Sequence, residues 1–311
     1  MKNNAWECHF WRLQVFIFFF GFIYLLSFQA LCQNGPDLFS INIEGKGKRI
    51  SLVEESLKQL TDRKEYDSQP NFINEFQMVF SAADENGNHD IIVYNFNNKK
   101  FTNLSKTSDR GEFSPGITDC GQYISAVVME EDGTQKLWLY PTNFEPAELL
   151  YDDIEPVGYY DWYDSKAAMF ILGTPNKLIY ANGRNDLKTI DTNIGRAIKT
   201  RPQSHQIGYL SNSNALENEN GKSLPFMIYD FKAENKRSYF HGLAGSQDFI
   251  WLDKSIILMA RKNEIFFRNI KNSEWISLGT IPSETHEGIT RMAFSKDLQV
   301  LVFAMNRKDN E

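Results

Sequence analysis

Hydrophobic residues occur along most of the chain in short runs that are rich in β-branched and aromatic side chains and are separated by turns of Asn, Asp and Gly. The runs "DIIVYNF" and "KLWLYP" are typical. Their composition favours strands that are packed on both faces. Helical periodicity is hard to find, and the one candidate, residues 53–60, is too short to be stable alone. The pattern therefore predicts an all-β protein.

The runs belong to a repeated phrase, in which a turn with an acidic residue is followed by four strands joined by short turns. The phrase occurs at residues 65–105, 111–150, 154–190, 195–240, 246–278 and, incompletely, 287–306. The equivalent first-strand positions are Phe72, Ile117, Trp162, Ile198, Trp251 and Phe294, at intervals of 45, 45, 36, 53 and 43 residues. Repeats of about 40–50 residues with several short strands indicate β-propeller blades. We expect six blades of four antiparallel strands.

The sixth copy of the phrase stops after two strands, and the N-terminal segment can supply the other two. "DLFSINIE", residues 37–44, resembles the third strand of the first copy, and "KQLT", residues 58–61, resembles its fourth. Pairing strands from the two ends of the chain in one blade would close the ring and leave no open sheet edge. We therefore predict that the N- and C-terminal strands share a blade.

The first 32 residues differ from the rest of the chain. An uncharged, largely apolar run extends from Leu13 to Pro36, which is the pattern of a secretory signal. The small residues Ala30 and Cys32 place the expected cleavage after Cys32, which leaves residues 33–311 as a single domain. Because the run exceeds roughly 18 residues, an uncleaved membrane anchor is the alternative. We expect a periplasmic or extracellular protein without membrane insertion beyond this leader.

The net charge limits the kinds of partner, and the cysteine content shows whether a disulfide can stabilise the fold. Removing the leader with Lys2, Arg12 and Glu7 changes the net charge from −7 to −8. This charge argues against nucleic acid and anionic membranes as partners. Cys120 is the one cysteine that remains, so no internal disulfide forms. No histidine or basic residue lies near Cys120 in the sequence, and we expect an inert thiol.

The blades also share a recognisable phrase. The first copy contains Gln69-Pro70-Asn71-Phe72, Val79-Phe80-Ser81, Gly87, Asp90-Ile91-Ile92-Val93-Tyr94 and Leu104-Ser105. This phrase resembles the repeats of TolB-type, WD-like β-propellers of exported bacterial proteins, "P-x-W/F-S-P-D-G…I-x-F…G…D-I-Y-V…L-T". No copy keeps S-P-D-G intact, although Asp119-Cys120-Gly121 is similar to it. The resemblance implies a periplasmic or surface propeller that serves as a protein-binding platform.

One loop has some features of a calcium site. "DENGNHD", residues 84–90, places an oxygen-bearing side chain at every second position, as a calcium loop does. However, His89 and Asn95 stand where an EF-hand needs a glycine and a glutamate. Asn86-Gly87 suits a tight hairpin, and the next copy has "EEDGTQK" in the same place. We expect a hairpin and no cofactor, with Ca²⁺ as the alternative.

Motifs for catalysis are lacking. The sequence has no G-x-S-x-G, no H-E-x-x-H and no cysteine pair with metal-ligand spacing. The histidines of the mature chain fall in predicted turns and loops, where solvated side chains are the expectation; they are His89, His205, His241 and His286. The rings of "YYDWYD", residues 159–164, could stack on a sugar or peptide, but alternation along a strand buries every other ring in the core.

These features favour a non-catalytic exported propeller that binds a protein or peptide partner in the cell envelope. One alternative is a propeller enzyme, a lyase or hydrolase with a divalent metal in the central channel. Another alternative is a carbohydrate-binding module. A stoichiometric metal would favour the enzyme, and binding to a glycan array would favour the carbohydrate-binding module.

Acidic residues occur in the loops that lead into the innermost strands. They are Glu65, Asp67, Glu112, Asp153, Glu155, Asp248 and Glu287, whereas the fourth copy has Arg196. Because a propeller chain enters every blade at its innermost strand, these loops surround one mouth of the channel. We predict that the acids concentrate a negative potential there and attract a cation or a basic peptide. The alternative is that they cap turns and stay solvated.

Overall fold

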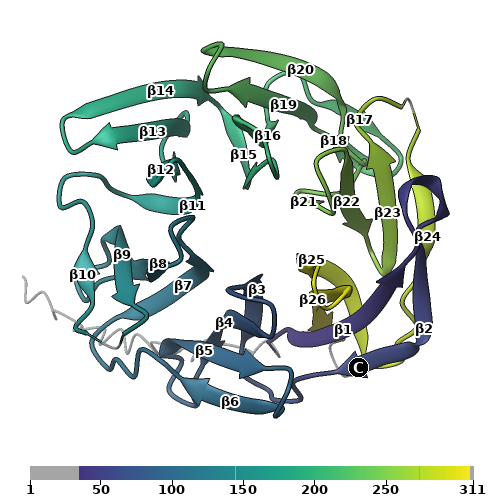
Figure 1. The fold of residues 1–311 in the computed structure, drawn as a ribbon, viewed down its shortest axis with the longest axis horizontal. Helices are drawn as coiled ribbons and strands as arrows, with labels where there is room; N and C mark the ends of the chain where they lie inside the picture. The colour runs from purple at the N-terminus through teal and green to yellow at the C-terminus, as the bar shows by residue number, and fades with distance from the viewer. Residues whose placement is uncertain (1–34, 144, 273, 309–311) are drawn as a thin grey trace, which may run out of the picture. The chain divides into compact units, whose positions relative to one another are not determined.

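The computed structural model describes residues 35–143, 145–272 and 274–308, and the leader predicted for residues 1–32 lies outside them. The described residues form six four-stranded antiparallel sheets and one additional two-stranded hairpin. Figure 1 shows the sheets as blades around a central opening. The 3₁₀ turn η1 (Gly47–Arg49) is the one helical element among the described residues. The predicted six-bladed, all-β propeller is confirmed.

Each of the first three blades consists of four consecutive strands, which follow one another from the channel outwards. Blade 1 contains β3 (Asp67–Phe72), β4 (Gln77–Ala83), β5 (His89–Asn95) and β6 (Lys100–Asn103). Blade 2 contains β7 (Gly111–Ile117), β8 (Tyr123–Met129), β9 (Gln135–Pro141) and β10 (Glu148–Leu149). Blade 3 contains β11 (Val157–Tyr163), β12 (Lys166–Ile171), β13 (Lys177–Gly183) and β14 (Asp186–Thr192).

The other three blades include the inserted hairpin and the joined termini. Blade 4 contains β15 (Ile194–Thr200), β16 (Gln206–Ser211), β19 (Pro225–Asp230) and β20 (Asn235–His241), with the hairpin β17 (Leu216–Asn218) and β18 (Gly221–Ser223). Blade 5 contains β21 (Ile250–Trp251), β22 (Ile256–Arg261), β23 (Glu264–Asn269) and β24 (Ile276–Thr280). Blade 6 contains β25 (His286–Ser295), β26 (Val300–Arg307), β1 (Asp37–Glu44) and β2 (Ser51–Gln59).

The repeat intervals correspond to this architecture. All six first-strand positions lie in innermost strands, namely β3, β7, β11, β15, β21 and β25. The longest interval, from Ile198 to Trp251, contains the β17–β18 hairpin between the second and third strands of blade 4. The innermost strands all begin at one face of the ring, which we call the entry face. Since the strands alternate in direction, the β17–β18 hairpin also lies at the entry face.

The two ends of the described chain meet in blade 6, as predicted. Strand β1 pairs with β26 in antiparallel register from Asp37 opposite Met305 to Asn42 opposite Val300. The segment Val53–Leu60, which was the helical candidate, lies mainly in the outermost strand β2. The ring is therefore closed by backbone hydrogen bonds between segments that are more than two hundred residues apart.

A buried polar cluster reinforces this closure. The side chain of Asp37 is fully buried at the start of β1. Its Oδ2 atom lies 2.8 Å from Nε2 of His286 and 2.6 Å from Nη2 of Arg307. Its Oδ1 atom accepts hydrogen bonds from the Thr61 hydroxyl (3.2 Å) and from the backbone N–H of Arg63 (3.1 Å). Asp37 thus connects the N-terminal strand to both C-terminal strands.

The structure corrects the expectation for two histidines. His89 was expected in a solvated turn, but it begins β5 and its ring packs against Phe113, with 4.4 Å between the ring centroids. His286 was expected to be a solvated loop residue, but it begins β25 and is only 2% exposed. Its ring packs edge-on against Phe39, with 4.9 Å between the ring centroids. The prediction for His286 was wrong because the partners Asp37 and Phe39 come from the opposite end of the chain.

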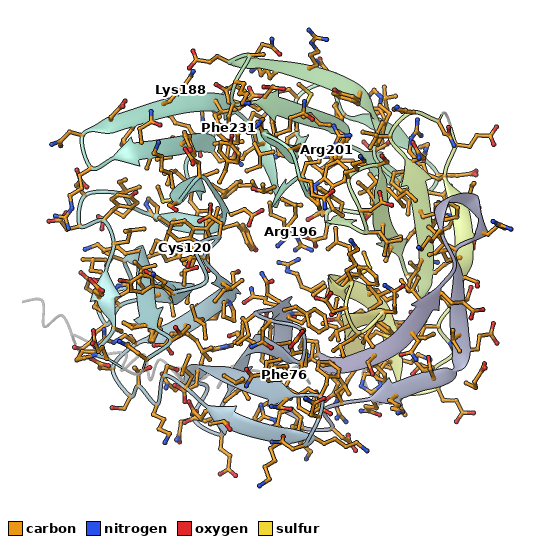
Figure 2. All side chains as sticks on the ribbon, viewed as in Figure 1. Phe76, Cys120, Lys188, Arg196, Arg201 and Phe231 are labelled. Atoms are coloured by element: carbon orange, nitrogen blue, oxygen red, sulfur yellow. The ribbon has the colours of Figure 1, made fainter. Side chains whose placement is uncertain are left out.

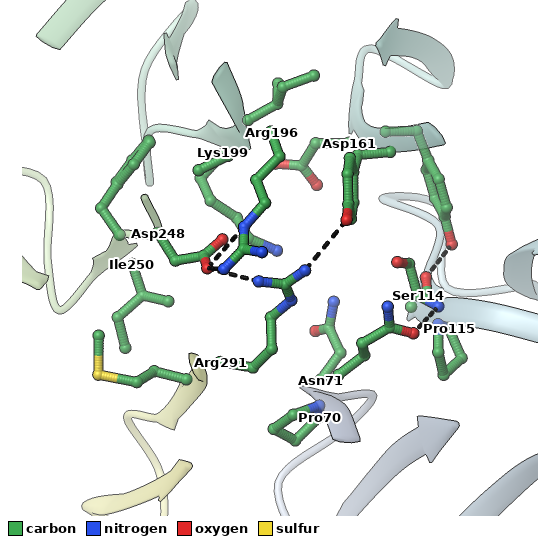
Figure 3. A pocket seen from close by; sticks show the side chains of 18 of the residues that line it. Pro70, Asn71, Ser114, Pro115, Asp161, Arg196, Lys199, Asp248, Ile250 and Arg291 are labelled. Atoms are coloured by element: carbon green, nitrogen blue, oxygen red, sulfur yellow. Dashed lines mark hydrogen bonds and ion pairs between the residues drawn. The ribbon is translucent and has the colours of Figure 1, made fainter. Parts of the chain in front are cut away.

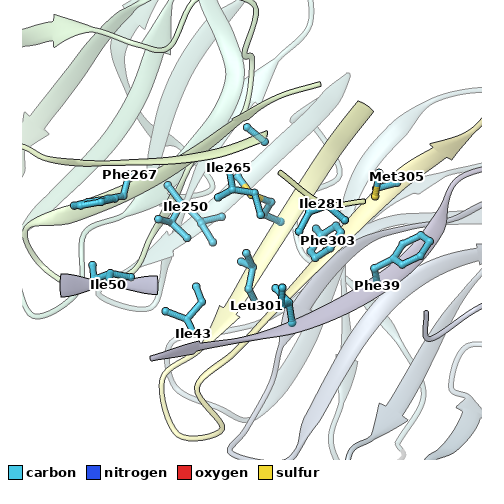
Figure 4. Close-up of a cluster of buried hydrophobic side chains, with 14 of the residues drawn as sticks. Phe39, Ile43, Ile50, Ile250, Ile265, Phe267, Ile281, Leu301, Phe303 and Met305 are labelled. Carbon is cyan, nitrogen blue, oxygen red and sulfur yellow. The ribbon is translucent and has the colours of Figure 1, made fainter. Parts of the chain in front are cut away.

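Apolar side chains fill the spaces between neighbouring blades. In the cluster of Figure 4, Ile250, Ile265 and Phe267 of blade 5 pack against Leu301 and Phe303 of blade 6. Strands near the channel are buried on both faces, and outermost strands such as β6 are largely exposed. Burying a side chain such as Phe303 contributes about 1.5–3 kcal/mol. Every blade therefore depends on its neighbours for most of its core.

We predict that Asp37→Asn lowers the free energy of unfolding by about 3 kcal/mol, because it leaves the buried His286 and the partly buried Arg307 without their shared, fully buried carboxylate. The control is Asp62→Asn, since Asp62 pairs with the same Arg307 at 2.5 Å but is largely exposed. It should cost less than about 1 kcal/mol. Denaturant titration of both variants makes the comparison, and equal losses would contradict the role given to Asp37.

Candidate binding site in the central channel

A small cavity lies at the centre of the ring and receives residues from all six innermost segments. Its volume is about 80 Å³. Each blade contributes one residue to the lining from an equivalent position. This position lies three residues before the aligned first-strand residue, or two residues before it in blade 4. These residues are Gln69, Ser114, Tyr159, Arg196, Asp248 and Arg291. The fold therefore brings one repeat position together six times.

Local backbone irregularities direct these side chains toward the channel. Gln69 and Ser114 have positive φ angles of 60° and 51°, and the strand register shifts at both positions. Such bulges re-aim side chains and interrupt the regular pairing. The Oε1 atom of Gln69 accepts a hydrogen bond of 2.6 Å from the backbone N–H of Ser114, which joins blades 1 and 2 at the channel.

Two arginines share a single carboxylate in the channel. Arg196 donates through Nε (3.0 Å) and Nη2 to Oδ2 of Asp248, and Arg291 donates through Nη1 (2.5 Å) to the same oxygen. Arg291 also donates through Nη2 to the hydroxyl of Tyr159 at 3.1 Å. Figure 3 shows the two guanidinium groups side by side at Asp248, and Figure 2 shows Arg196 reaching into the central opening. Blades 3 to 6 are thereby connected through one cluster.

The cluster keeps Arg291 charged despite its burial. Burial lowers the pKa of Arg291, but the Asp248 carboxylate and the hydroxyls of Tyr159 and Tyr66 together raise the pKa above its ordinary value. Its side chain is 17% exposed. The channel thus contains a permanent, largely desolvated positive charge.

Two further charged residues line the cavity. Lys199 extends into the same space as the arginines (Figure 3), and its ammonium group has no ion-pair or hydrogen-bond partner among the described residues. Asp161 is held by the backbone N–H of Thr200, which donates to its Oδ2 atom. The cavity lining therefore has three cations and two carboxylates.

The seven acids predicted to surround the channel mouth occupy different environments. Asp248 is the one that lines the central cavity. Asp153, Glu155 and Glu287 are exposed at the entry face, and Glu65 is partly buried in the loop before β3. Glu155 also lies 3.5 Å from the ammonium group of Lys136. Ligand recognition by these acids stays a prediction.

The remaining two acids, Asp67 and Glu112, are fully buried within the blades. Asp67 forms an ion pair with Arg63, and burial raises the pKa of Asp67 although the arginine opposes this shift. Glu112 accepts hydrogen bonds from the hydroxyls of Thr107 (2.7 Å) and Tyr140 (2.8 Å). Both carboxylates are therefore occupied by partners of their own blade or the adjoining loop.

The arginine cluster was not identified from the sequence. Loop composition singles out Arg196 only as an exception among acids, and it does not single out Arg291. The signal was nevertheless present, because aligning the copies places Asp248 and Arg291 at the same repeat position and Arg196 one residue away from it. The rings of residues 159–164 behave as expected, since Tyr160 and Trp162 are buried in the core.

The segment "DENGNHD" forms the predicted hairpin between β4 and β5. The Oδ1 atom of Asp84 accepts hydrogen bonds of 2.8 Å from the backbone N–H groups of Asn86 and Asn88, and Gly87 has a φ of 82°. These bonds lower the pKa of Asp84. Within the described ranges, no group of three or more His, Cys, Asp or Glu side chains is arranged to hold a metal ion. The expectation of no cofactor, with Ca²⁺ as the alternative, stays a prediction.

Glu112 should make stability depend on pH. Burial raises the pKa of Glu112, while its hydrogen bonds oppose the shift. The native state then binds this proton more tightly than the unfolded state does, so stability falls as pH rises from about 4.5 toward the raised pKa. We predict that Glu112→Gln removes this part of the slope and that the exposed Glu155→Gln keeps it. Unfolding free energies from pH 4 to 8 provide the measurement, and parallel curves for the protein and Glu112→Gln would contradict it.

Comparisons with known proteins support the fold. No family model matches the sequence, and a search of curated proteins finds no match. Among solved structures, a putative TolB from Agrobacterium tumefaciens aligns with a TM-score of 0.65 and 8% identity, covering 88% of this chain and 99% of the other. TolB from Acinetobacter baumannii aligns with a TM-score of 0.54 and 8% identity, covering 87% of this chain and 64% of the other.

A third similar structure is a chain of a nidogen/laminin complex, with a TM-score of 0.55 and 9% identity, covering 78% of this chain and 92% of the other. At these identities the similarity establishes the fold. The described part of the chain contains no helix with the length and apolar character needed to cross a membrane. The structure therefore confirms the predicted TolB-like, WD-like β-propeller architecture.

Proposed function

We propose that this protein is an exported, non-catalytic β-propeller that binds a protein or peptide partner at its entry face, in the periplasm or at the cell surface. The apolar run from Leu13 to Pro36 supports export. The similarity to TolB propellers and to a chain of a nidogen/laminin complex agrees with a binding role. A fold alone does not determine function, so the geometry of the site must support the proposal.

The size of the central cavity is the observation that carries the proposal. At about 80 Å³ it is far smaller than the roughly 300–1,000 Å³ typical of pockets that enclose a small-molecule ligand. A ligand larger than a single functional group must therefore lie mainly outside this central cavity. In a propeller, the loops between the strands can hold such a ligand, because loops on a rigid scaffold commonly carry binding residues.

The entry face has the more elaborate loops. It contains the inserted β17–β18 hairpin and the exposed acids Asp153, Glu155 and Glu287. A cavity of about 920 Å³ lies beside the hairpin and is lined by residues including Glu219, Arg261 and Glu287. This mixed-charge surface suits a polar protein partner, because complementary charges guide association and fix orientation.

The opposite face provides a natural control. Cys120 lies there, in the turn between β7 and β8, and its thiol is exposed. A bulky maleimide reagent attached to Cys120 should leave partner binding unchanged if the entry face is the binding surface.

We predict that a photo-crosslinker at Glu287 captures the partner from native envelope extract, whereas one at Asn98, in the β5–β6 turn of the opposite face, does not. The variant Asp153→Asn/Glu155→Gln/Glu287→Gln should weaken capture about three- to tenfold at low salt, because it removes charges that guide association. The matched variant Glu54→Gln/Glu55→Gln, on the outermost strand β2, should have no effect. Equal capture from both faces, or none from the entry face, would contradict the proposal.

A further inference from the structure

The charges that line the channel do not cancel. Arg196, Lys199 and Arg291 face two carboxylates, Asp161 and Asp248, which leaves one excess positive charge in a cavity of about 80 Å³. The side chains of Arg196 and Arg291 are only 32% and 17% exposed, so water compensates this charge poorly. An uncompensated charge in such a place is costly, and an anion beside it is stabilising.

Some N–H donors of the cluster remain available to an anion. Both arginines donate to the Oδ2 atom of Asp248, and their other bonds go to the Thr290 carbonyl and the Tyr159 hydroxyl. Among the described residues, no acceptor is found for Nη1 of Arg196, for Nε of Arg291 or for the ammonium group of Lys199. Arginine groups are suited to planar carboxylates, which they bind through paired N–H donors.

Two further cavities adjoin the central cavity on the side of the entry face. A second cavity, of about 390 Å³, lies between blades 5 and 6 and shares Arg196, Asp248, Arg291 and Met292 with the channel cavity. It shares Gly245, Lys262 and Gly288 with the cavity of about 920 Å³ beside the β17–β18 hairpin. We call these two outer cavities the radial groove. Its lining includes Glu287 at the rim of the entry face and reaches Arg196 and Arg291 of the cluster.

We propose that the channel centre binds one carboxylate, carried by an extended peptide segment of the partner that lies in the radial groove. This inference rests on the proposed function, since it names the chemical group by which the entry face holds its partner. The cavity accommodates a carboxylate group but not a residue with its side chain. The exposed acids of the rim would then contact basic residues farther along the same segment.

A carboxylate fits the site better than a phosphate does. The excess charge of the lining is a single positive charge, which one carboxylate neutralises. A phosphate monoester carries about −1.5 to −2 charges at pH 7 and would leave negative charge beside Asp161 and Asp248. Apolar contacts from Pro70, Ile250 and Met292 in the same lining also suit a group that is less strongly hydrated than phosphate.

Removing the negative charge of Asp248 should strengthen carboxylate binding, although Asp248 itself lines the site. Asp248 occupies guanidinium donors that the incoming carboxylate needs, and it also repels that carboxylate. Asp248→Asn should therefore strengthen carboxylate binding, by about tenfold. If the acids of this face bind a cation instead, the same substitution weakens binding of the cation and creates no carboxylate site.

The test is a titration of the full-length protein with N-acetylglycine, and with N-acetylglycinamide as the neutral control, observed through the Nε–H resonances of Arg196 and Arg291. We expect a saturable shift with the acid only. Lys199→Gln should weaken acid binding about threefold, and Lys232→Gln, in the β19–β20 turn of the opposite face, should not change it. Asp248→Asn and Lys199→Gln both retain the two arginines, so the test does not depend on an arginine variant that fails to fold.

Two peptides identify the source of the carboxylate and test the groove. N-acetyl-triglycine offers a terminal carboxylate, and N-acetyl-Gly-Glu-Gly-amide offers one on a side chain. The peptide that binds more tightly shows whether the carboxylate is terminal or on a side chain. This peptide should also bind more tightly than N-acetylglycine, because it contacts the groove as well. Equal shifts with acid and amide, weaker binding by Asp248→Asn, tighter binding of inorganic phosphate, or no gain with either peptide would each overturn the inference. Since no partner is needed, these outcomes are separate from those of the crosslinking experiment.

Discussion

The arrangement of every blade depends on the closure of the ring in blade 6. A propeller whose last blade is built from both ends of the chain has no free sheet edge, but it must hold together segments that are distant in sequence. In this protein the β1–β26 pairing supplies the backbone hydrogen bonds, and Asp37 adds buried contacts to His286 and Arg307. Asp37 is fully buried and needs these polar partners, and a shifted strand register would separate it from them.

The closed ring in turn determines what the channel can do. Each blade contributes a residue from its innermost strand or from the segment just before it, so residues that are distant in sequence, and not a contiguous motif, set the chemistry at the centre. In this chain those residues include two arginines and one aspartate, and Lys199 lies beside them. A narrow channel with excess positive charge, surrounded by exposed acids at the entry face, suits recognition of a polar segment from outside. The proposed function follows from this arrangement and not from the fold alone.

Much of the fold could be predicted from the sequence because its signals are local. Alternating β-branched and aromatic residues, turns such as Asn86-Gly87 and the spacing of the copies all reflect strands and hairpins within one blade. The closure was also predictable, since residues 37–44 resemble a third strand. The burial of His286 could not be anticipated from its loop context, because its partners Asp37 and Phe39 lie at the other end of the chain.

The candidate site was harder to predict, because strand irregularities decide which side chains face the channel. Asp67 and Glu112 precede the shifted register of β3 and β7 and turn into the blades, whereas Gln69 and Ser114, within the irregular segments, line the cavity. Counting acids in loops therefore gave a different set from the one that aligned repeat positions would have given. The exposed acids Asp153, Glu155 and Glu287 were recognisable from loop composition alone.

The central claim is that the joining of the termini is part of the global fold. Native-state hydrogen exchange of the unmodified protein tests this claim most directly. If closure holds the ring, the amides that connect β1 with β26 exchange only by global unfolding, with the same free energy as the best-protected amides of β8 and β16. If β1 and β2 instead exchange through a local opening of much lower free energy while the other blades stay protected, the termini are an appendage and the account is wrong.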